Sequence, residues 1–172
     1  MEVQRRFLKS SAVLFAVGMT VGVMAGQPLT VSARWFRNSV SACAGSQGTT
    51  QVDVIAQNVG TGFYSSLICP VPDTDRLRKE ELDRINIHVK DSTTQNNVFA
   101  RACIAYYNLD GNGSCGAVDS TTDAGTGWDT LRPSLSKFTS ANASHWGYVN
   151  IGLPPAQGSN DPSKMTGYYG TD

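Results

Sequence analysis

Residues 146–153 have the sequence Trp-Gly-Tyr-Val-Asn-Ile-Gly-Leu, in which small or apolar residues alternate with larger or polar ones. A period of two is typical of a β-strand packed on one face, because successive side chains of a strand point to opposite sides. We expect the core face to consist of Gly147, Val149, Ile151 and Leu153. The opposite face, predicted to meet solvent, carries Trp146, Tyr148 and Asn150.

The same alternation recurs at residues 85–90 and 98–107, and turn-forming sequences separate the predicted strands. Residues 110–113, Asp-Gly-Asn-Gly, form a strong hairpin signal. Short strands at this regular spacing favour an antiparallel arrangement over a parallel one. The predicted fold is therefore all-β, a single antiparallel β-sandwich of jelly-roll or immunoglobulin-like type, stapled by disulfides.

We divide the chain into three parts. Residues 51–172 are predicted to form the sandwich domain, and residues 34–50 an irregular N-terminal lead-in. The charge-dense segment 73–84 is expected to hold one short, solvated helix over residues 76–82.

Residues 1–33 have the layout of a secretory signal peptide. Basic residues within the first nine positions precede an uncharged, Gly-containing run at residues 10–26. Small residues suit cleavage after Ala33, and a cut after Ala25 stays open. A run of about 17 residues is at the lower limit for spanning a bilayer, so an uncut anchor is less favoured. The prediction is a secreted or periplasmic protein, exported by the general secretory or the twin-arginine route, with no stable membrane insertion after cleavage.

The four cysteines, Cys43, Cys69, Cys103 and Cys115, all follow the predicted signal. An even number of cysteines in an oxidising compartment indicates two disulfides, for which three pairings exist. We expect Cys43–Cys69 and Cys103–Cys115, because the second, short loop suits a bridge between adjacent strands across a turn. The spacing contains no Cys-x2-Cys pair with a neighbouring His, so no metal site is predicted.

The charge balance gives no reason to expect nucleic acid or an anionic membrane surface as a partner. The chain has 14 basic and 14 acidic residues, and removing residues 1–33 takes away three basic residues and one acidic one, which leaves a net charge of −2. A nearly neutral domain lacks the field that attracts nucleic acid, so we predict no nucleic-acid binding. No sequence motif indicates a cofactor, and none is predicted.

Several short motifs give the chain a resemblance to a known group. They are Cys-Pro-Val-Pro-Asp at residues 69–73, Val-Lys-Asp at 89–91, Ala-Cys-Ile at 102–104 and Tyr-Val-Asn-Ile-Gly-Leu-Pro at 148–154. In order and spacing they are similar to those of small secreted bacterial β-sandwich proteins of unknown function, which share Cys-Pro-x-x-Asp and Tyr…Leu-Pro strand motifs. The resemblance covers roughly residues 52–170.

This resemblance implies an exported β-sandwich domain and brings no catalytic residues. Such proteins often have a cysteine in the Tyr…Leu-Pro strand, whereas residues 150–152 here contain none. The resemblance therefore implies that Cys115 replaces that cysteine as the partner of Cys103.

No acid–base or nucleophile set stands out, so we predict that the protein is not an enzyme. His88 and His145 are the only histidines, and the chain lacks a Gly-x-Ser-x-Gly nucleophile elbow. Glu80 and Glu81 are adjacent, so they point apart instead of forming a catalytic pair. Residues 110–114 resemble the start of a calcium loop but lack its later ligands, so a hairpin turn is the better interpretation.

The aromatic residues supply the main functional hint. Trp146 and Tyr148 share one strand face, and Trp128, Tyr106 and Tyr107 would lie near them if their strands were neighbours. Aromatic platforms on a β-sandwich suit sugar rings, so we predict a non-catalytic module that binds a glycan or another cell-envelope component through Trp146, Tyr148 and Trp128. The competing interpretation buries these aromatics as core. The alternative function is a structural, self-associating extracellular surface protein.

Overall fold

The structure is a computed structural model that describes residues 33–52, 54–74, 76–106, 112–122, 127–141, 144–157 and 161–172. One compact unit spans Ser32–Asp172. The predicted signal peptide, apart from Ala33, lies outside the described residues, as do Tyr107 and the Asp-Gly pair at 110–111. No helix in the part of the chain that the structure describes is long and apolar enough to cross a membrane.

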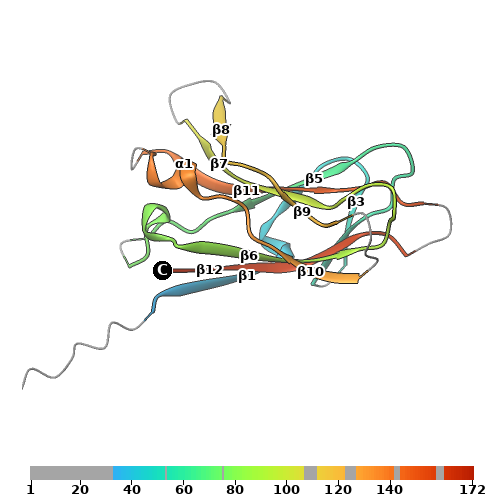
Figure 1. The fold of residues 1–172 in the computed structure, drawn as a ribbon, viewed down its shortest axis with the longest axis horizontal. Helices are drawn as coiled ribbons and strands as arrows, with labels where there is room; N and C mark the ends of the chain where they lie inside the picture. The colour runs from blue at the N-terminus through green and yellow to red at the C-terminus, as the bar shows by residue number, and fades with distance from the viewer. Residues whose placement is uncertain are drawn as a thin grey trace, which may run out of the picture. The chain divides into compact units, whose positions relative to one another are not determined.

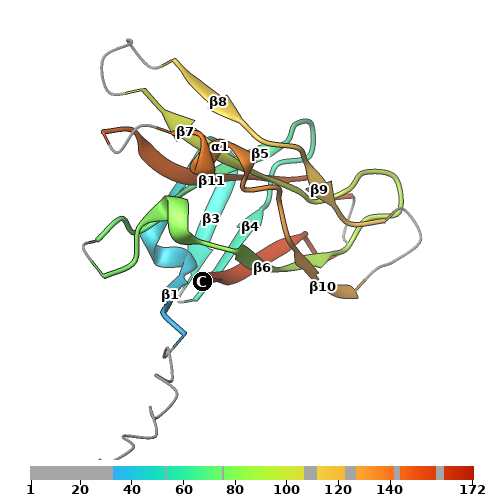
Figure 2. The same ribbon diagram turned by 60° about the vertical axis from the view of Figure 1, so that its left-hand side comes forward.

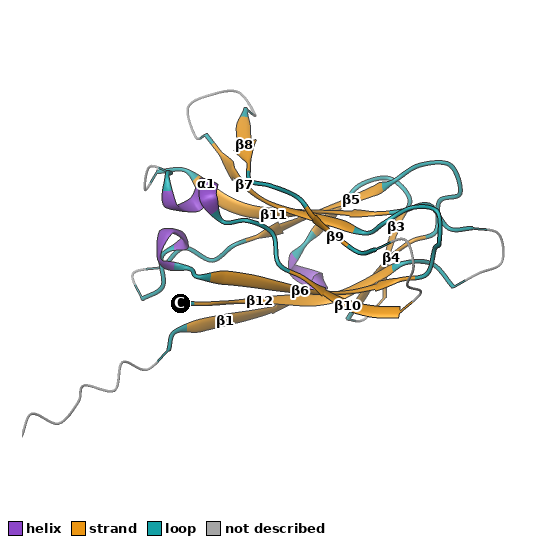
Figure 3. Ribbon diagram, in the orientation of Figure 1, coloured by secondary structure: helices purple, strands orange, loops and turns teal. Residues whose placement is uncertain are grey.

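Two antiparallel sheets of six strands each form two layers (Figures 1 and 3). Sheet A contains β10 (Gly127–Leu131), β6 (Arg84–Asp91), β12 (Lys164–Thr171), β4 (Ile55–Asn58) and β3 (Thr49–Val52) in that order, with β1 (Trp35–Ser39) also paired to β12. Sheet B contains β2 (Ala44–Gly45), β5 (Ser65–Pro70), β11 (Trp146–Leu153), β7 (Phe99–Ala105) and β8 (Gly113–Cys115), with β9 (Asp119–Ser120) also paired to β7.

The strand pairing is that of a jelly roll. β4 pairs with β12, β5 with β11, β6 with β10, and β7 with β8 and β9, so the chain folds back on itself as nested antiparallel pairs. Successive members of this series alternate between the sheets, as in double-sheet jelly rolls. The predicted antiparallel sandwich is confirmed, and the jelly-roll form of it is the one observed.

The core lies between the sheets, and on β11 it is made by the residues that alternation assigned to it. β11 contributes Val149, Ile151 and Leu153, all fully buried, while Trp146 on the opposite face is 68% exposed. Buried side chains of the facing sheet include Ile85, Ile87, Val89, Met165 and Tyr168.

Tyr168 links the two sheets by polar contacts as well as by packing. Its Oη donates a hydrogen bond to the carbonyl oxygen of Pro70 in β5 and accepts one from Asn38 Nδ2 at 3.0 Å. Burial raises the pKa of the Tyr168 hydroxyl, against an opposite effect of the Asn38 hydrogen bond. These two hydrogen bonds satisfy the polar end of a side chain that is otherwise buried between the sheets.

Residues 34–50 are not an irregular lead-in, and this prediction is wrong. β1 pairs along its whole length with β12, from Trp35 opposite Thr171 to Ser39 opposite Gly167. A 3₁₀-helix, η1 (Val40–Ala42), and the short β2 follow. The strand escapes recognition because its partner is at the far end of the chain, so its local sequence alone gives little signal.

The charged segment forms less helix than predicted. Within residues 76–82, all of which the structure describes, only Lys79–Glu81 is helical, as the 3₁₀-helix η2. The helix α1 (Ser136–Thr139) packs near it. Lys79 is fully buried, with its Nζ 2.7 Å from Asp73 Oδ2 and 3.5 Å from Glu80 Oε2. The interpretation as a solvated helix is therefore wrong, because the loop folds around a buried ammonium group that needs carboxylate partners.

Both predicted disulfides are present. Cys43 is joined to Cys69 of β5, and Cys103 of β7 to Cys115 of β8, with Cα–Cα distances of 4.1 and 4.0 Å. Cys103 and Cys115 are directly opposite in the β7–β8 ladder, so the second bridge staples these neighbouring strands (Figure 2).

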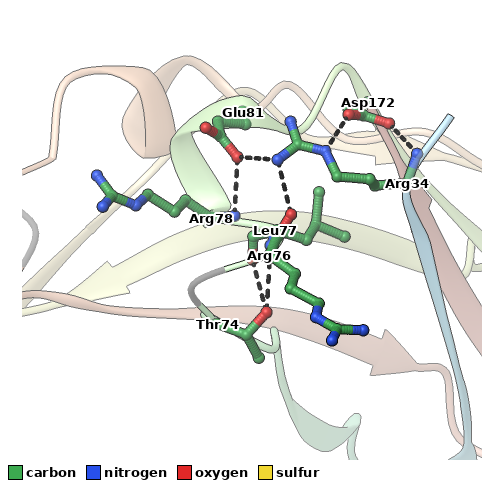
Figure 4. Close-up of polar contacts among 7 residues, drawn as sticks. All are labelled: Arg34, Thr74, Arg76, Leu77, Arg78, Glu81 and Asp172. Carbon is green, nitrogen blue, oxygen red and sulfur yellow. Dashed lines mark hydrogen bonds and ion pairs between the residues drawn. The ribbon is translucent and has the colours of Figure 1, made fainter. Parts of the chain in front are cut away.

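Arg34 connects the start of the described chain to its end (Figure 4). Its Nε lies 2.7 Å from Asp172 Oδ2, and its Nη1 lies 3.0 Å from Glu81 Oε2 and donates to the carbonyl oxygen of Arg76. Arg34 lowers the pKa of the Asp172 carboxyl, chiefly through the side-chain hydrogen bond, and its own pKa is raised in return. This ion-pair cluster secures the end of sheet A where β1 and β12 meet.

Candidate functional site

The outer face of sheet B carries the two aromatic residues predicted on β11. Trp146 lies opposite Ala105 of β7, and Tyr148 lies between Pro70 of β5 and Cys103 of β7. Directly opposite residues of an antiparallel pair share a face, so all of these side chains lie on the outer side of sheet B. Cys103, which is disulfide-bonded to Cys115, is nevertheless fully buried there. Trp146 is exposed and Tyr148 is half-buried.

A shallow groove of about 530 Å³ follows this surface, and we call it the aromatic groove. Its lining is almost wholly apolar and includes exposed Ile68 and Pro70 of β5 beside Trp146. The full lining is Ala42, Ala44, Ile68, Pro70, Ala105, Trp146, Gly147 and Tyr148. Because alanines and a glycine make up half of this lining, the rings of Trp146 and Tyr148 are its largest side chains.

Polar groups adjoin the aromatic groove on the same strands. Asn150, two residues after Tyr148, lies opposite Ile68 on β5 and Arg101 on β7. Its Oδ1 accepts a hydrogen bond of 2.8 Å from Ser66 Oγ. The surface therefore pairs an apolar platform with an amide and a hydroxyl that could reach a ligand.

Arg101 is held in place by aromatic packing. Its guanidinium lies 5.3 Å from the centroid of the Phe99 ring, and its buried Nε has no hydrogen-bond partner. Phe99 in turn lies across Gly152, where a Cβ would come within 2.2 Å of the ring. A side chain at Gly152 would displace Phe99 and with it the support of Arg101.

Trp128 does not join Trp146 and Tyr148. It belongs to β10 of sheet A, opposite Lys90 of β6, and is 60% exposed. The sequence showed that Trp128 is in a strand but not which sheet holds that strand. The three predicted ligand-binding residues therefore lie on two different sheets.

Tyr106, His88 and His145 do not line the aromatic groove either. Tyr106 packs against the core and makes an edge contact with His145, with ring centroids 4.8 Å apart. His88 lies on the exposed face of β6, as its alternation predicted, and stacks on Tyr169. Among the described residues, no group of three His, Cys, Asp or Glu side chains is placed to hold a metal ion.

Sequence reasoning missed Ile68, Pro70 and Arg101 as neighbours of the aromatic pair. Each comes from a strand far from β11 in the sequence, and only the register of β5 and β7 against β11 places them together. Ile68 is 50% exposed, as single apolar residues on protein surfaces often are, so its residue type does not show which face of the strand it occupies.

Comparison with solved structures gives a distant likeness, whereas comparison with family models and curated proteins gives none. Among solved structures it is similar to a family 11 carbohydrate-binding module from Clostridium thermocellum, in complex with a β-1,3-1,4-mixed-linked tetrasaccharide. The two are 10% identical with a TM-score of 0.40, over 81% of this chain and 88% of that chain. A likeness this distant says nothing of a ligand.

Proposed function

We propose that the protein is an exported, non-catalytic module that binds a glycan of the cell envelope or of the surroundings through the aromatic groove. The observation that carries this proposal is the exposure of Trp146, 68% of whose surface is open, inside a groove with Tyr148 and a largely apolar lining. A flat aromatic ring gives the C–H face of a pyranose an apolar surface on which to pack.

The polar neighbours support a sugar over a purely apolar ligand. Asn150 presents an amide on the same face of β11 as Tyr148, and the Ser66 hydroxyl bonded to it lies further along that face. Sugars carry hydroxyl groups that need hydrogen-bond partners once desolvated. Small-molecule sites generally combine an apolar lining with a few such polar groups. The shallowness of the groove suits a chain that lies across the sheet.

Binding should depend on Trp146 and Tyr148 and not on Trp128. The purified, oxidised chain would be titrated with neutral polysaccharides and with peptidoglycan, by calorimetry or affinity electrophoresis. We expect Trp146→Ala and Tyr148→Ala each to weaken binding roughly tenfold or more, which corresponds to about 1.4 kcal/mol. For the neutral polysaccharides Trp128→Ala is the matched control, since it removes a similarly exposed Trp from the other sheet.

Equal weakening by all three substitutions would contradict the assignment to the aromatic groove. Unchanged circular dichroism and unfolding midpoints of the variants would show that lost binding is not lost folding.

Self-association is the second candidate, and exposed Ile68 favours it. Ile68 and Trp146 are 50% and 68% exposed on one apolar surface, which a second copy of the chain could cover. The absence of polymer binding, together with a mass that rises with concentration and falls in Ile68→Ser, would replace the glycan proposal with this one.

A further inference from the structure

The outer face of sheet A has two hollows that share one residue, His88. One, of about 380 Å³, includes Arg37 and Tyr169 in its lining, and the other, of about 390 Å³, includes Trp128 and Arg132. This face belongs to a different sheet from the aromatic groove and has a different character, because charged and aromatic side chains alternate across it.

An aromatic stack forms the centre of this surface. The rings of His88 and Tyr169 lie 5.6 Å apart between centroids, with an angle of 29° between their planes. His88 Nδ1 is also 3.2 Å from Thr130 Oγ1 of the neighbouring strand β10, which holds the ring in position. The stack is therefore a preorganised platform and not a loose pair of exposed side chains.

Arginines flank the stack on both sides. Arg37 on β1 and Asn86 on β6 are each directly opposite Tyr169 of β12, so their Cα atoms are roughly 10 Å apart, given the usual strand spacing. Asn86 Oδ1 accepts a hydrogen bond of 2.9 Å from Arg132 Nε, which anchors that guanidinium over the far side.

Neither guanidinium is neutralised within the part of the chain that is described. The ion pairs found there use Arg34, Lys79, Lys90 and Lys164, and neither of the two guanidinium groups forms one. The Asp119 carboxylate near Arg132 contacts its backbone, since Asp119 Oδ2 accepts a hydrogen bond of 2.6 Å from the Arg132 N–H. Arg37 lies 6.0 Å from the Trp35 ring, a cation–π contact that leaves its charge available. Asp129, on edge strand β10, places one carboxylate in the lining of the second hollow. The two arginines line the hollows on either side of the His88–Tyr169 stack.

We propose that this surface, which we call the arginine face (Arg37, Asn86, His88, Arg132 and Tyr169), binds an acidic polysaccharide whose sugar rings carry carboxylates. The guanidinium group matches a carboxylate in a planar, bidentate geometry, and the His88–Tyr169 stack offers a surface for the sugar ring. A neutral chain would cover both arginines without replacing the hydration of their charges. The inference concerns a second site and does not depend on the aromatic groove.

Polygalacturonate and its fully methyl-esterified form provide the test, since they share one backbone and differ in charge. The purified, oxidised chain should bind polygalacturonate at low salt, at least tenfold more tightly than the ester, and the binding should weaken as salt is added. Arg37→Gln and Arg132→Gln should each weaken it at least fivefold. Arg76→Gln, which removes an exposed arginine outside the arginine face, should change it less than twofold.

The same titrations with the Trp146→Ala variant separate the arginine face from the aromatic groove, because that substitution changes the surface of sheet B alone. Retention of polygalacturonate binding in Trp146→Ala, with loss in Arg37→Gln, supports the proposal even if no neutral polymer binds. Equal binding of acid and ester, equal effects of Arg76→Gln and Arg37→Gln, or no binding to polygalacturonate at low salt would each overturn it.

Discussion

Asp91 shows how much of this fold depends on one buried polar residue. The carboxylate is 1% exposed and accepts hydrogen bonds from the backbone N–H groups of Thr93 and Val98 at 3.0 and 3.3 Å. The hydroxyls of Thr93, Thr121 and Ser163 also donate to it. These donors come from three segments far apart in the chain, so Asp91 joins the end of β6 to the loops before β7, after β9 and before β12.

Asp91→Ala should lower the free energy of unfolding by about 3 kcal/mol, because several buried donors lose their acceptor at once. Urea denaturation of the oxidised protein measures this change. Asp83→Ala is the control, as Asp83 is exposed and should shift the free energy by less than about 0.5 kcal/mol. A loss below about 1 kcal/mol for Asp91→Ala would mean that the donors find other partners.

At the scale of elements, β1 is an integral strand of sheet A. Phe36 points inward, lies edge-on to the Tyr168 ring with centroids 5.9 Å apart, and covers Gly170, where a Cβ would meet its ring at 2.3 Å. Trp35, one residue earlier, points outward and is 65% exposed. The same strand thus supplies one structural aromatic and one surface aromatic.

Phe36→Ala should cost about 2 kcal/mol of unfolding free energy, less than a fully buried Phe would, because Phe36 is only partly buried. Trp35→Ala removes a larger ring from the neighbouring position and should cost less than about 0.5 kcal/mol. Urea denaturation of both variants tests the pair. Similar small losses for the two would indicate that β1 adds little to the sandwich.

At the scale of the whole molecule, the ion-pair cluster at Arg34 ties η2 and the strands at both ends of the described chain together. Arg34 lowers the pKa of Asp172, so the charged carboxylate is favoured in the folded state. A lowered folded-state pKa gives stability that is fully present above the unfolded-state pKa of about 3.9 and is lost as the pH falls below it.

Asp172→Asn should therefore narrow the difference in stability between pH 6 and pH 3, since the amide does not titrate there. Urea denaturation at both pH values measures it. Asp161, whose pKa is lowered by Lys164 and Lys90, still titrates in the variant, so some acid sensitivity should persist. Identical pH profiles for the variant and the parent protein would show that the Arg34–Asp172 pair does not contribute to stability.

Local patterns in the sequence predicted the strands at residues 85–90, 98–107 and 146–153 and separated the two faces of each. Trp146–Leu153 illustrates this, because a period of two is a local property of the backbone and places Trp146 and Val149 on opposite faces whatever the neighbouring strand is. The Cys103–Cys115 disulfide could also be predicted from a local signal, because a short hairpin places its two strands side by side.

Beyond such local hairpins, the neighbours of each strand follow from the tertiary structure. It placed Trp128 on the sheet opposite Trp146, paired β1 with β12, and brought Arg37 and Arg132 to the two sides of Tyr169. Such contacts join segments far apart in the chain, and they are selected by the packing of the whole core instead of by any local pattern. Buried Lys79 and Asp91 belong to this group too, since their polar partners exist only once the loops are folded.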